Sequence, residues 1–332
     1  MPFFSSEVPQ DFKESVRLDK YIASLKDGMN RSKLKSSATE IYLNDRLAKL
    51  SSKVKAGDLI EIQWDDNIPT DIKPENIPLN IIYEDDNVTV VNKEQGMVTH
   101  PASGNWNGTL VNALLYHWNR SAIAEIKDDD ISKVLANRRP GIVHRLDKDT
   151  SGIIITAKNS DAQSWLCEQF LKRKLHKEYI LITKGRPPAS AGDVKTQIFR
   201  DPKDRKKFKA AVDSTQGKFA RTLYKVIAYY GNYSLIRVRL KTGRTHQIRV
   251  HMKYLGCPIL GDPIYGKKDE RFPDATLMLH SRQIDIRLPE KDVFTRFRAA
   301  VPERFKKIIT ELSQNFEKEI PVMPKRYVKN DR

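Results

Sequence analysis

The chain has 332 residues and a formal net charge of +17 at pH 7, because 59 Lys and Arg residues outnumber 42 Asp and Glu residues. Its apolar fraction of 39% is sufficient for a folded core and excludes a globally disordered chain, and its length predicts one large domain and one small one. The charge excess indicates a polyanionic partner, although membrane surfaces and heparin-like polymers would be attracted by the same charge.

Two cysteines, Cys167 and Cys257, lie far apart and belong to no Cys/His cluster, so we expect neither a disulfide framework nor a metal site. The first residues lack the basic start and the long apolar core of a signal peptide. No apolar run is long enough to span a membrane. These observations predict a cytoplasmic protein that does not associate with membranes.

The N-terminal part of the chain has the pattern of a small domain. Apolar residues recur at helical spacing within residues 16–26, which predicts a short helix with basic residues around it. A second short helix is expected next, and residues 41–47 and 54–62 then predict short strands, with a turn at Gly57-Asp58. This order of elements indicates a small α/β domain over residues 1–64.

Residues 65–79 contain three prolines and few periodic apolar residues, which is typical of a linker. In residues 80–320, strand-like runs outnumber helical ones and do not alternate with them regularly, which predicts an α+β domain around a mixed, largely antiparallel sheet. Strands are predicted at 88–91, 153–157, 179–183, 219–228, 233–240 and 276–286, and helices at 108–118, 161–173, 245–255 and 302–315. The basic tail, residues 321–332, is expected to be flexible.

One stretch, GIVHRLDKDTSG from Gly141 to Gly152, places Asp147 in a segment that has the residues of a tight turn. An ionised carboxylate that leaves bulk water needs a partner, and Arg145 is a candidate two residues away. A carboxylate held in this way keeps its charge, as a nucleophile or a general base requires. For an isolated R-x-D sequence, a salt-bridged aspartate that caps a turn is the simpler interpretation.

The whole stretch, however, resembles the H-R-L-D-x-x-T-S-G signature of the RluA-type pseudouridine synthases. Three further blocks resemble that family in the same order, and together they cover about residues 80–290. These blocks are Asp85–Lys93, Lys177-Glu178-Tyr179 and Thr242–His251, the last continued by Gly261-Asp262-Pro263-Ile264-Tyr265-Gly266. The resemblance implies the pseudouridine synthase fold, in which an active-site cleft crosses an extended sheet, and the isomerisation of uridine to pseudouridine in RNA. That reaction needs no cofactor and no metal.

The resemblance also implies roles for individual residues. Asp147 is expected to be the nucleophile, whether at C1′ or at C6 of the nucleotide, and Arg249 its buried ion-pair partner. Tyr179 is expected to lie against the flipped-out base, although a tyrosine in a strand would otherwise be read as a core residue. Ile248 is expected to form an apolar wall beside the base.

Other residues of these blocks are expected to contact RNA. Arg145 either enters the RNA stack or contacts phosphate, or else it forms the local salt bridge to Asp147. Lys177 and Arg244 are expected to bind the substrate. His144 and His246, in contrast, are expected to be structural hydrogen-bonding residues. Two basic runs, 172–177 and 200–209, are expected to contact phosphates rather than to be merely solvated.

The N-terminal unit resembles an S4 RNA-binding domain, with Asn30 and Asn44-Asp45 as departures from its pattern; a generic small α/β subdomain is the alternative. The resemblance implies RNA contacts by a set of basic residues, Arg17, Lys20, Arg31 and Lys33. Together with the block from Val98 to Leu115, it is similar to the D-type enzymes that act on large-subunit rRNA. We therefore expect a monomer that acts on 23S rRNA. The alternatives are the same chemistry on tRNA and a non-catalytic RNA-binding ribosome-assembly factor.

Overall fold

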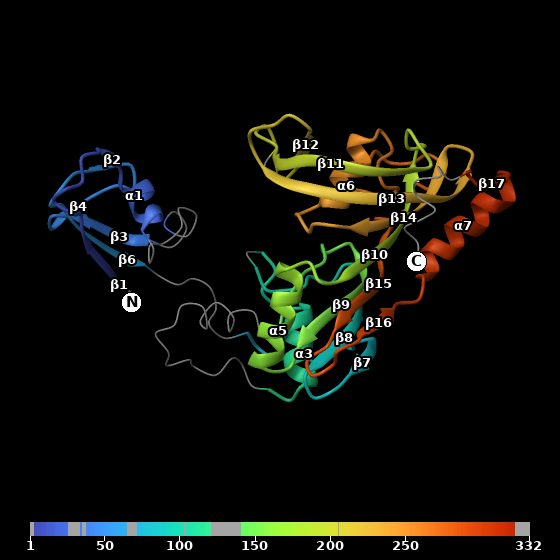
Figure 1. The fold of residues 1–332 in the computed structure, drawn as a ribbon, viewed down its shortest axis with the longest axis horizontal. Helices are drawn as coiled ribbons and strands as arrows, with labels where there is room; N and C mark the ends of the chain where they lie inside the picture. Colours follow the sequence, from blue (N-terminus) through green and yellow to red (C-terminus); the bar gives the residue numbers. More distant parts are fainter. Residues whose placement is uncertain are drawn as a thin grey trace. The chain divides into compact units, whose positions relative to one another are not determined.

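The computed structural model of the chain describes residues 3–25, 34, 38–64, 72–102, 104–120, 141–204 and 206–322. The chain divides into two compact units, Met1–Asp71 and Ile72–Arg332 (Figure 1). Among the described residues, no helix is long and apolar enough to cross a membrane.

The smaller unit contains a four-stranded sheet in the order β1-β6-β3-β4, a separate two-stranded pair of β2 and β5, and one described helix, α1. The helix lies within the predicted range 16–26, and its apolar face packs into a core with Val54, Ile60 and Ile62. The predicted second helix lies outside the described residues. The bounds are β1 (Phe3–Glu7), β2 (Val16–Arg17), α1 (Leu18–Ser24), β3 (Ala38–Leu43), β4 (Arg46–Leu47), β5 (Lys53–Val54) and β6 (Leu59–Trp64).

Each of the two strands predicted in this unit is divided by a turn. Asn44 and Asp45 have φ angles of 51° and 61°, the geometry of the two-residue turn that joins β3 to β4. The Asn44 amide stabilises this turn, since it donates to Asp58 and accepts from the Leu59 N–H. Residues 54–62 similarly divide into the end of β5 and the start of β6, with the predicted turn at Gly57 between them.

The larger unit is built on an 11-stranded sheet in the order β12-β11-β13-β14-β10-β15-β9-β8-β7, with β16 beside β15 and β17 beside β13. Among the strands that the structure describes here, β9 and β15 pair in parallel and the other neighbours are antiparallel, so the predicted mixed sheet is confirmed. The bounds are β7 (Ile81–Glu84), β8 (Val88–Lys93), β9 (Ser151–Ala157), β10 (His176–Lys184), β11 (Ala191–Arg200), β12 (Phe208–Ala211), β13 (Lys218–Tyr230), β14 (Tyr233–Leu240), β15 (Leu279–Arg287), β16 (Phe294–Arg298) and β17 (Lys318–Glu319).

Four described helices pack against this sheet, near the ranges predicted from the sequence. They are α3 (Leu110–His117), α5 (Ser160–Leu171), α6 (Gln247–Tyr254) and α7 (Glu303–Asn315). Helices α3 and α5 bury their apolar residues against β8 and β9, whereas α6 and α7 contribute to the core beside β10, β13 and β14 (Figure 1). Buried apolar surface therefore stabilises the sheet both at β8 and β9 and at β10, β13 and β14.

Residues 72–79, predicted as the end of a linker, belong to the larger unit. Ile72 packs against Val111 and Leu115 of α3. The Asn112 side chain, in turn, donates to the Lys73 carbonyl. Burial and hydrogen bonding against α3 explain why these residues are ordered despite their prolines.

Gly152 brings the Asp147 loop close to the centre of the sheet. It is the second residue of β9 and has a φ of 111°, and a Cβ there would lie 2.2 Å from the Ser281 carbonyl oxygen of β15. Only glycine fits this conformation and this approach. Strand β15 also pairs with β10, so the loop before β9 lies near Tyr179.

Candidate active site

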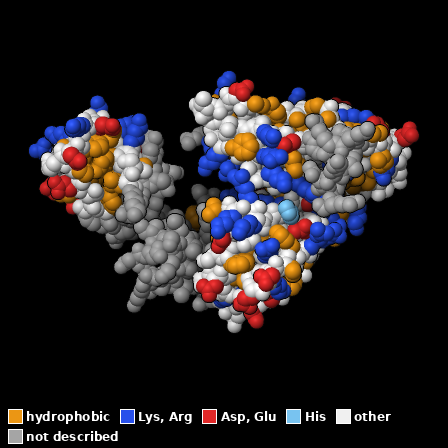
Figure 2. Space-filling view, viewed as in Figure 1, with side chains coloured by type: hydrophobic (Ala, Val, Ile, Leu, Met, Phe, Trp, Pro, Cys, Tyr) orange, Lys and Arg blue, Asp and Glu red, His pale blue; other side chains and the backbone are white. Residues whose placement is uncertain are grey.

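The described part of the larger unit contains a pocket of 960 Å³ between the Asp147 loop, β10, β14 and the start of α6. Figure 2 shows Lys and Arg side chains around the hollow between the two halves of this unit. Asp147 is the only Asp or Glu among the described residues that line the pocket. The basic residues in the lining are Arg145, Arg173, Lys177, Lys195, Arg221, Lys241, Arg244 and Arg249.

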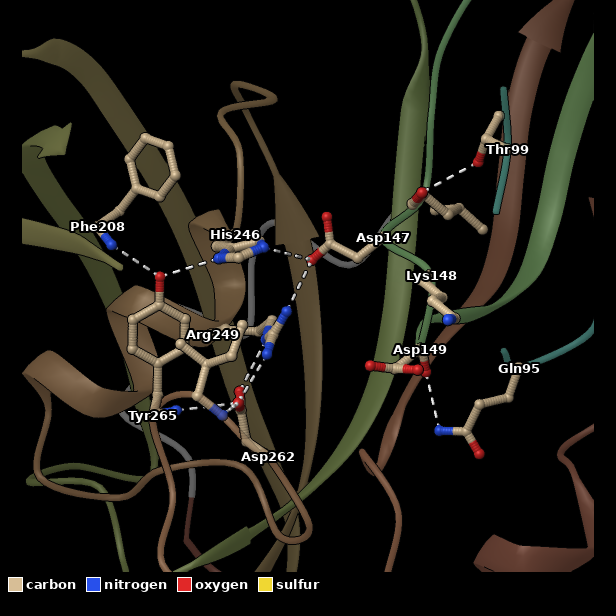
Figure 3. A network of polar contacts seen from close by, with 12 residues as sticks. Gln95, Thr99, Asp147, Lys148, Asp149, Phe208, His246, Arg249, Asp262 and Tyr265 are labelled. Atoms are coloured by element: carbon tan, nitrogen blue, oxygen red, sulfur yellow. Dashed lines mark hydrogen bonds and ion pairs between the residues drawn. The ribbon is translucent and has the colours of Figure 1, made fainter. Parts of the chain in front are cut away.

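Side-chain donors hold the Asp147 loop at the main-chain carbonyls of Leu146, Lys148 and Asp149, and Figure 3 shows the bonds at Leu146 and Asp149. The Thr99 hydroxyl donates to the Leu146 carbonyl at 3.0 Å, and the Gln95 amide donates to the Asp149 carbonyl at 2.9 Å. Between them, the buried Lys93 ammonium donates to the Lys148 carbonyl at 3.1 Å, and burial lowers the pKa of Lys93 to about 8. The position of the Asp147 loop is thus set by the last residue of β8 and by the segment that follows it.

Arg249 lies between two carboxylates, as Figure 3 shows, and holds one more closely than the other. Its Nε and Nη2 donate to Asp262 at 2.8 and 2.7 Å, while its Nη1 donates to Asp147 at 3.3 Å. Burial acts to lower the pKa of Arg249, but the two carboxylates outweigh it and raise that pKa. The structure therefore contains the ion pair expected between Asp147 and Arg249, and adds Asp262 as the main anchor of the guanidinium.

Asp262 was given no role in the sequence analysis. Its side chain is fully buried, and its Oδ1 also accepts from the main-chain N–H groups of Ile264 and Tyr265. The available signal was an aspartate between glycine and proline, which is typical of a side chain that caps its own turn. Its partner Arg249 is 13 residues away in sequence, and no local pattern indicates that pairing.

His246 also faces Asp147. Its Nε2 lies 3.8 Å from the Asp147 Oδ2, and its Nδ1 lies 2.9 Å from the Tyr265 hydroxyl oxygen, which accepts from the Phe208 N–H (Figure 3). Burial lowers the pKa of His246, while the charge of Asp147 opposes that shift. The prediction of a hydrogen-bonding histidine agrees with this geometry, but the position of His246 beside the Asp147 carboxylate could not be predicted from its neighbours in sequence.

Tyr179 lines the pocket and is only 6% exposed. Burial raises the pKa of its hydroxyl to about 12, although a hydrogen bond to Ser281 opposes this shift. At neutral pH the phenol is therefore un-ionised. It can stack on a base and donate a hydrogen bond, whereas proton abstraction by a phenolate is disfavoured.

The remaining predicted substrate contacts also line the pocket. Ile248 is buried in the wall, and Arg244 is held by a hydrogen bond to the Phe219 carbonyl. Lys177 lies 5.5 Å from the centre of the Phe170 ring, and burial lowers the pKa of its ammonium to about 8. Arg145 is exposed and has no ion pair with Asp147 among the described residues, so the local salt bridge is not formed there.

His144 is a structural residue, as expected. Its Nε2 accepts from the Ile155 N–H at 3.0 Å, and its ring stacks on Phe170. Burial lowers the pKa of His144 to about 3, so the ring is neutral and its second nitrogen carries the proton.

In the smaller unit, Arg17 forms an ion pair with buried Asp19 at 3.0 Å, and Lys20 is exposed. Arg31 and Lys33 lie outside the described residues. Within the described ranges of both units, no group of His, Cys, Asp and Glu residues could hold a metal ion.

Comparison with known proteins gives one consistent result. The family described as RNA pseudouridylate synthase matches residues 87–254. A Borreliella burgdorferi protein named ribosomal large subunit pseudouridine synthase D is 42% identical over 88% of both chains. A Haemophilus influenzae protein of the same name is also 42% identical, over 79% of this chain and 76% of that one.

Among solved structures, human RNA pseudouridylate synthase domain containing 1 has a similar fold, with a TM-score of 0.56. The match covers 77% of this chain and 94% of the human chain at 22% identity, so it supports the fold alone. The sequence relatives, the shared fold and the basic pocket around a single carboxylate all lead to one assignment. The chain belongs to the RluA-type family of RNA pseudouridine synthases, which are isomerases.

Proposed function

We propose that this pocket isomerises uridines of large-subunit (23S) rRNA, with Asp147 as the nucleophile. The observation that carries the proposal is the position of Asp147, the single carboxylate in the described lining of a basic pocket. One nitrogen of Arg249 contacts it, and the rest of its carboxylate faces the pocket with 21% of the side chain exposed. A fixed, charged and accessible carboxylate is what attack on the nucleotide requires.

The reaction breaks the N1–C1′ bond of uridine and forms a C5–C1′ bond, while C5 loses a proton and N1 gains one. No electrons are exchanged with an external group, so the chemistry needs only a nucleophile and groups that move protons. Asp147 attacks either C1′ or C6. The neutral Tyr179 stacks against the base, which must first leave the RNA stack to reach the pocket. Ile248 supplies the apolar wall on the base.

Charge around the pocket supports binding of an RNA backbone. A second hollow of 1190 Å³ on the sheet face shares His176, Lys177, Lys195, Arg221 and Lys241 with the pocket. Eight Lys or Arg residues and three carboxylates line this hollow within the described chain. Basic side chains along a continuous surface position phosphates.

Individual cations near the entrance have their own proposed roles. Lys177 and Arg244 bind the phosphates next to the flipped nucleotide. Arg145, which is exposed at the rim, contacts phosphate or enters the gap that the base leaves. The described residues of the basic run 200–209 lie at the end of β11, in the turn that follows and at the start of β12, and we expect them to contact phosphates as well.

The proposed target follows from the relatives, because the proteins from Borreliella burgdorferi and Haemophilus influenzae are named as enzymes of the ribosomal large subunit. We further propose that the smaller unit is an S4-like RNA-binding domain. Its short helix, its two-residue turn at Asn44-Asp45 and its exposed Lys20 are consistent with this assignment.

Tritium release from [5-³H]uridine-labelled RNA tests the proposal, since C5 loses its hydrogen only when isomerisation occurs. We expect release from large-subunit rRNA and little from small-subunit rRNA or tRNA. Asp147→Asn should abolish release, while Asp149→Asn, the same change two residues away in the same loop, should retain it. Release by Asp147→Asn would refute the nucleophile, and release from tRNA alone would refute the target.

A further inference from the structure

We propose that His246 is a positioning residue for Asp147: it donates a hydrogen bond from Nε2 to the carboxylate and orients it for attack. This inference rests on the proposed role of Asp147 and adds a second group that holds it. The Nε2 of His246 lies 3.8 Å from the Asp147 Oδ2, the same oxygen that Arg249 contacts at 3.3 Å. Hydrogen bonds in an empty site are often long and shorten when substrate is bound.

The backbone of His246 indicates that its place is enforced. It is the N-cap of α6 and has a φ of 55°, in the left-handed region. Its side chain makes no capping hydrogen bond to the helix, so capping does not explain the conformation. A non-glycine residue in this region is strained, and such strain persists where the surrounding structure fixes it. The conformation directs the ring toward Asp147 (Figure 3).

Hydrogen bonds at Tyr265 favour one tautomer of His246. The Tyr265 oxygen accepts from the Phe208 N–H at 2.9 Å, which leaves the hydroxyl hydrogen free to donate to the His246 Nδ1, also at 2.9 Å. With Nδ1 as the acceptor, the proton of a neutral imidazole lies on Nε2, the nitrogen that faces Asp147. The Phe208 N–H of β12 thus favours Nε2 as the imidazole donor, because it occupies an acceptor site of the Tyr265 oxygen and leaves the hydroxyl hydrogen for Nδ1.

Packing fixes the ring itself. Phe208 and Tyr265 both contact it edge-on, with ring centres 5.7 and 5.6 Å from that of His246. The charged groups that act on the imidazole are Asp147, Arg249, Asp262 and Arg145. Of these groups, Asp147 is the one whose oxygen lies within ion-pair distance of the imidazole in the described chain. A ring held by two aromatic neighbours and by a hydrogen bond at Nδ1 can fix one rotamer of that carboxylate.

Two substitutions of His246 distinguish the Nε2–H donor from the other contacts of this side chain. His246→Asn tolerates the left-handed conformation and can still accept from Tyr265, but its amide is too short to reach Asp147. His246→Gln carries an amide N–H near the position of Nε2. His251→Asn is the matched control, because His251 is buried in the same helix, bonded to Thr196 and Thr222, and is not in the pocket lining.

The experiment measures kcat and KM for tritium release from large-subunit rRNA, with the melting temperature of each variant. For His246→Asn we expect kcat to fall by about ten- to a hundredfold, the value of one hydrogen bond to a charged group, with KM unchanged. His246→Gln should recover most of kcat. His251→Asn should lower the melting temperature but leave kcat of the folded enzyme intact.

The tautomer provides a readout independent of activity. The ¹⁵N chemical shifts of His246 should show the proton on Nε2 in the wild type and a mixture of tautomers in Tyr265→Phe. A wild-type proton on Nδ1, or wild-type kcat in His246→Asn, would overturn the inference. If Asp147→Asn remains active, the proposed function fails; if Asp147→Asn is inactive and His246→Asn is fully active, only the role of His246 fails.

Discussion

Asp262 is the anchor of Arg249, and its replacement by asparagine tests whether that anchor controls the proposed nucleophile. In the wild type, the Asp262 carboxylate accepts from two guanidinium nitrogens at 2.7 and 2.8 Å, and Asp147 accepts from a third at 3.3 Å. In Asp262→Asn, one of the two close acceptors becomes an NH₂ donor that faces a guanidinium donor. Of the two carboxylates that contact the Arg249 guanidinium in the wild type, only Asp147 then keeps its negative charge.

Loss of one partner from a buried ion pair costs about 3–5 kcal/mol. At roughly 2–4 °C per kcal/mol for a domain of this size, the melting temperature should fall by about 6–20 °C. Freed from Asp262, the guanidinium can rotate onto Asp147 and occupy lone pairs that face the pocket. Because displacement of a reacting group by about 1 Å can cost 10²-fold in rate, we expect kcat to fall by about that factor.

Asp269→Asn is a closely matched control. Asp269 is buried, its Oδ1 accepts from the main-chain N–H groups two and three residues later, and it pairs with one cation, Lys184. It therefore has the same local arrangement as Asp262, but its cation Lys184 does not line the pocket, whereas Arg249, the cation held by Asp262, does. Tritium release and thermal melting are measured for both variants at a temperature where both are folded. Equal losses of kcat in the two, or wild-type kcat in Asp262→Asn, would refute the reasoning.

Three further results are expected. Burial lowers the pKa of Lys93 from 10.5 to about 8, so the folded protein releases this proton at a lower pH than the unfolded chain does. The free energy of unfolding should therefore rise by about 1.4 kcal/mol per pH unit between these two pKa values. Denaturant titrations of Lys93→Met should lack this rise with pH. Tyr179→Phe keeps the stacking ring but loses the hydroxyl, and tritium release should fall by about 10²-fold with little change in RNA affinity; an unchanged rate would leave the hydroxyl without a role. Lys177→Met should reduce the salt slope of single-stranded RNA binding by about 0.7, and an unchanged slope would exclude a phosphate contact.

Elements with strong periodicity could be predicted from the sequence, and those with weaker signals could not. The predicted strand at 233–240 matches β14, whose Val238 and Ile236 are buried. Strand β11 was missed, although Val194, Thr196 and Ile198 alternate inward along it, because one of the buried positions is a threonine. Sheet packing, rather than side-chain hydropathy alone, decides such a strand.

Short edge strands were missed for a related reason. Strand β12 has four residues and β7 has four, so each offers at most two residues per face as a signal. Their hydrogen bonds to the neighbouring strands define them, as between Ile198 of β11 and Ala210 of β12, and a pattern of four residues does not indicate such a pairing. The linker was overextended because prolines in residues 72–79 resemble flexible chain until their contact with α3 is known.

In the candidate site, too, some residues could be predicted from local sequence and others could not. Resemblance to the family identified Asp147, Tyr179 and Arg249 from local blocks, and the structure brings all three to one pocket. The contacts between blocks could not be predicted in this way, since Arg249 and Asp147 are 102 residues apart. Asp262 and His246 matter through such contacts, and each resembles an ordinary turn residue when only its neighbours in sequence are considered.

The two carboxylates are held unequally, which explains how the buried Arg249 can hold the proposed nucleophile without blocking it. Asp262 is fully buried and takes two guanidinium nitrogens, whereas Asp147 is 21% exposed and takes one. A symmetric bidentate pair between Arg249 and Asp147 would be stronger but would engage both carboxylate oxygens. Because Asp262 accepts from two of the guanidinium nitrogens, Arg249 contacts Asp147 at one oxygen only, and the other oxygen is available for the proposed attack on the nucleotide.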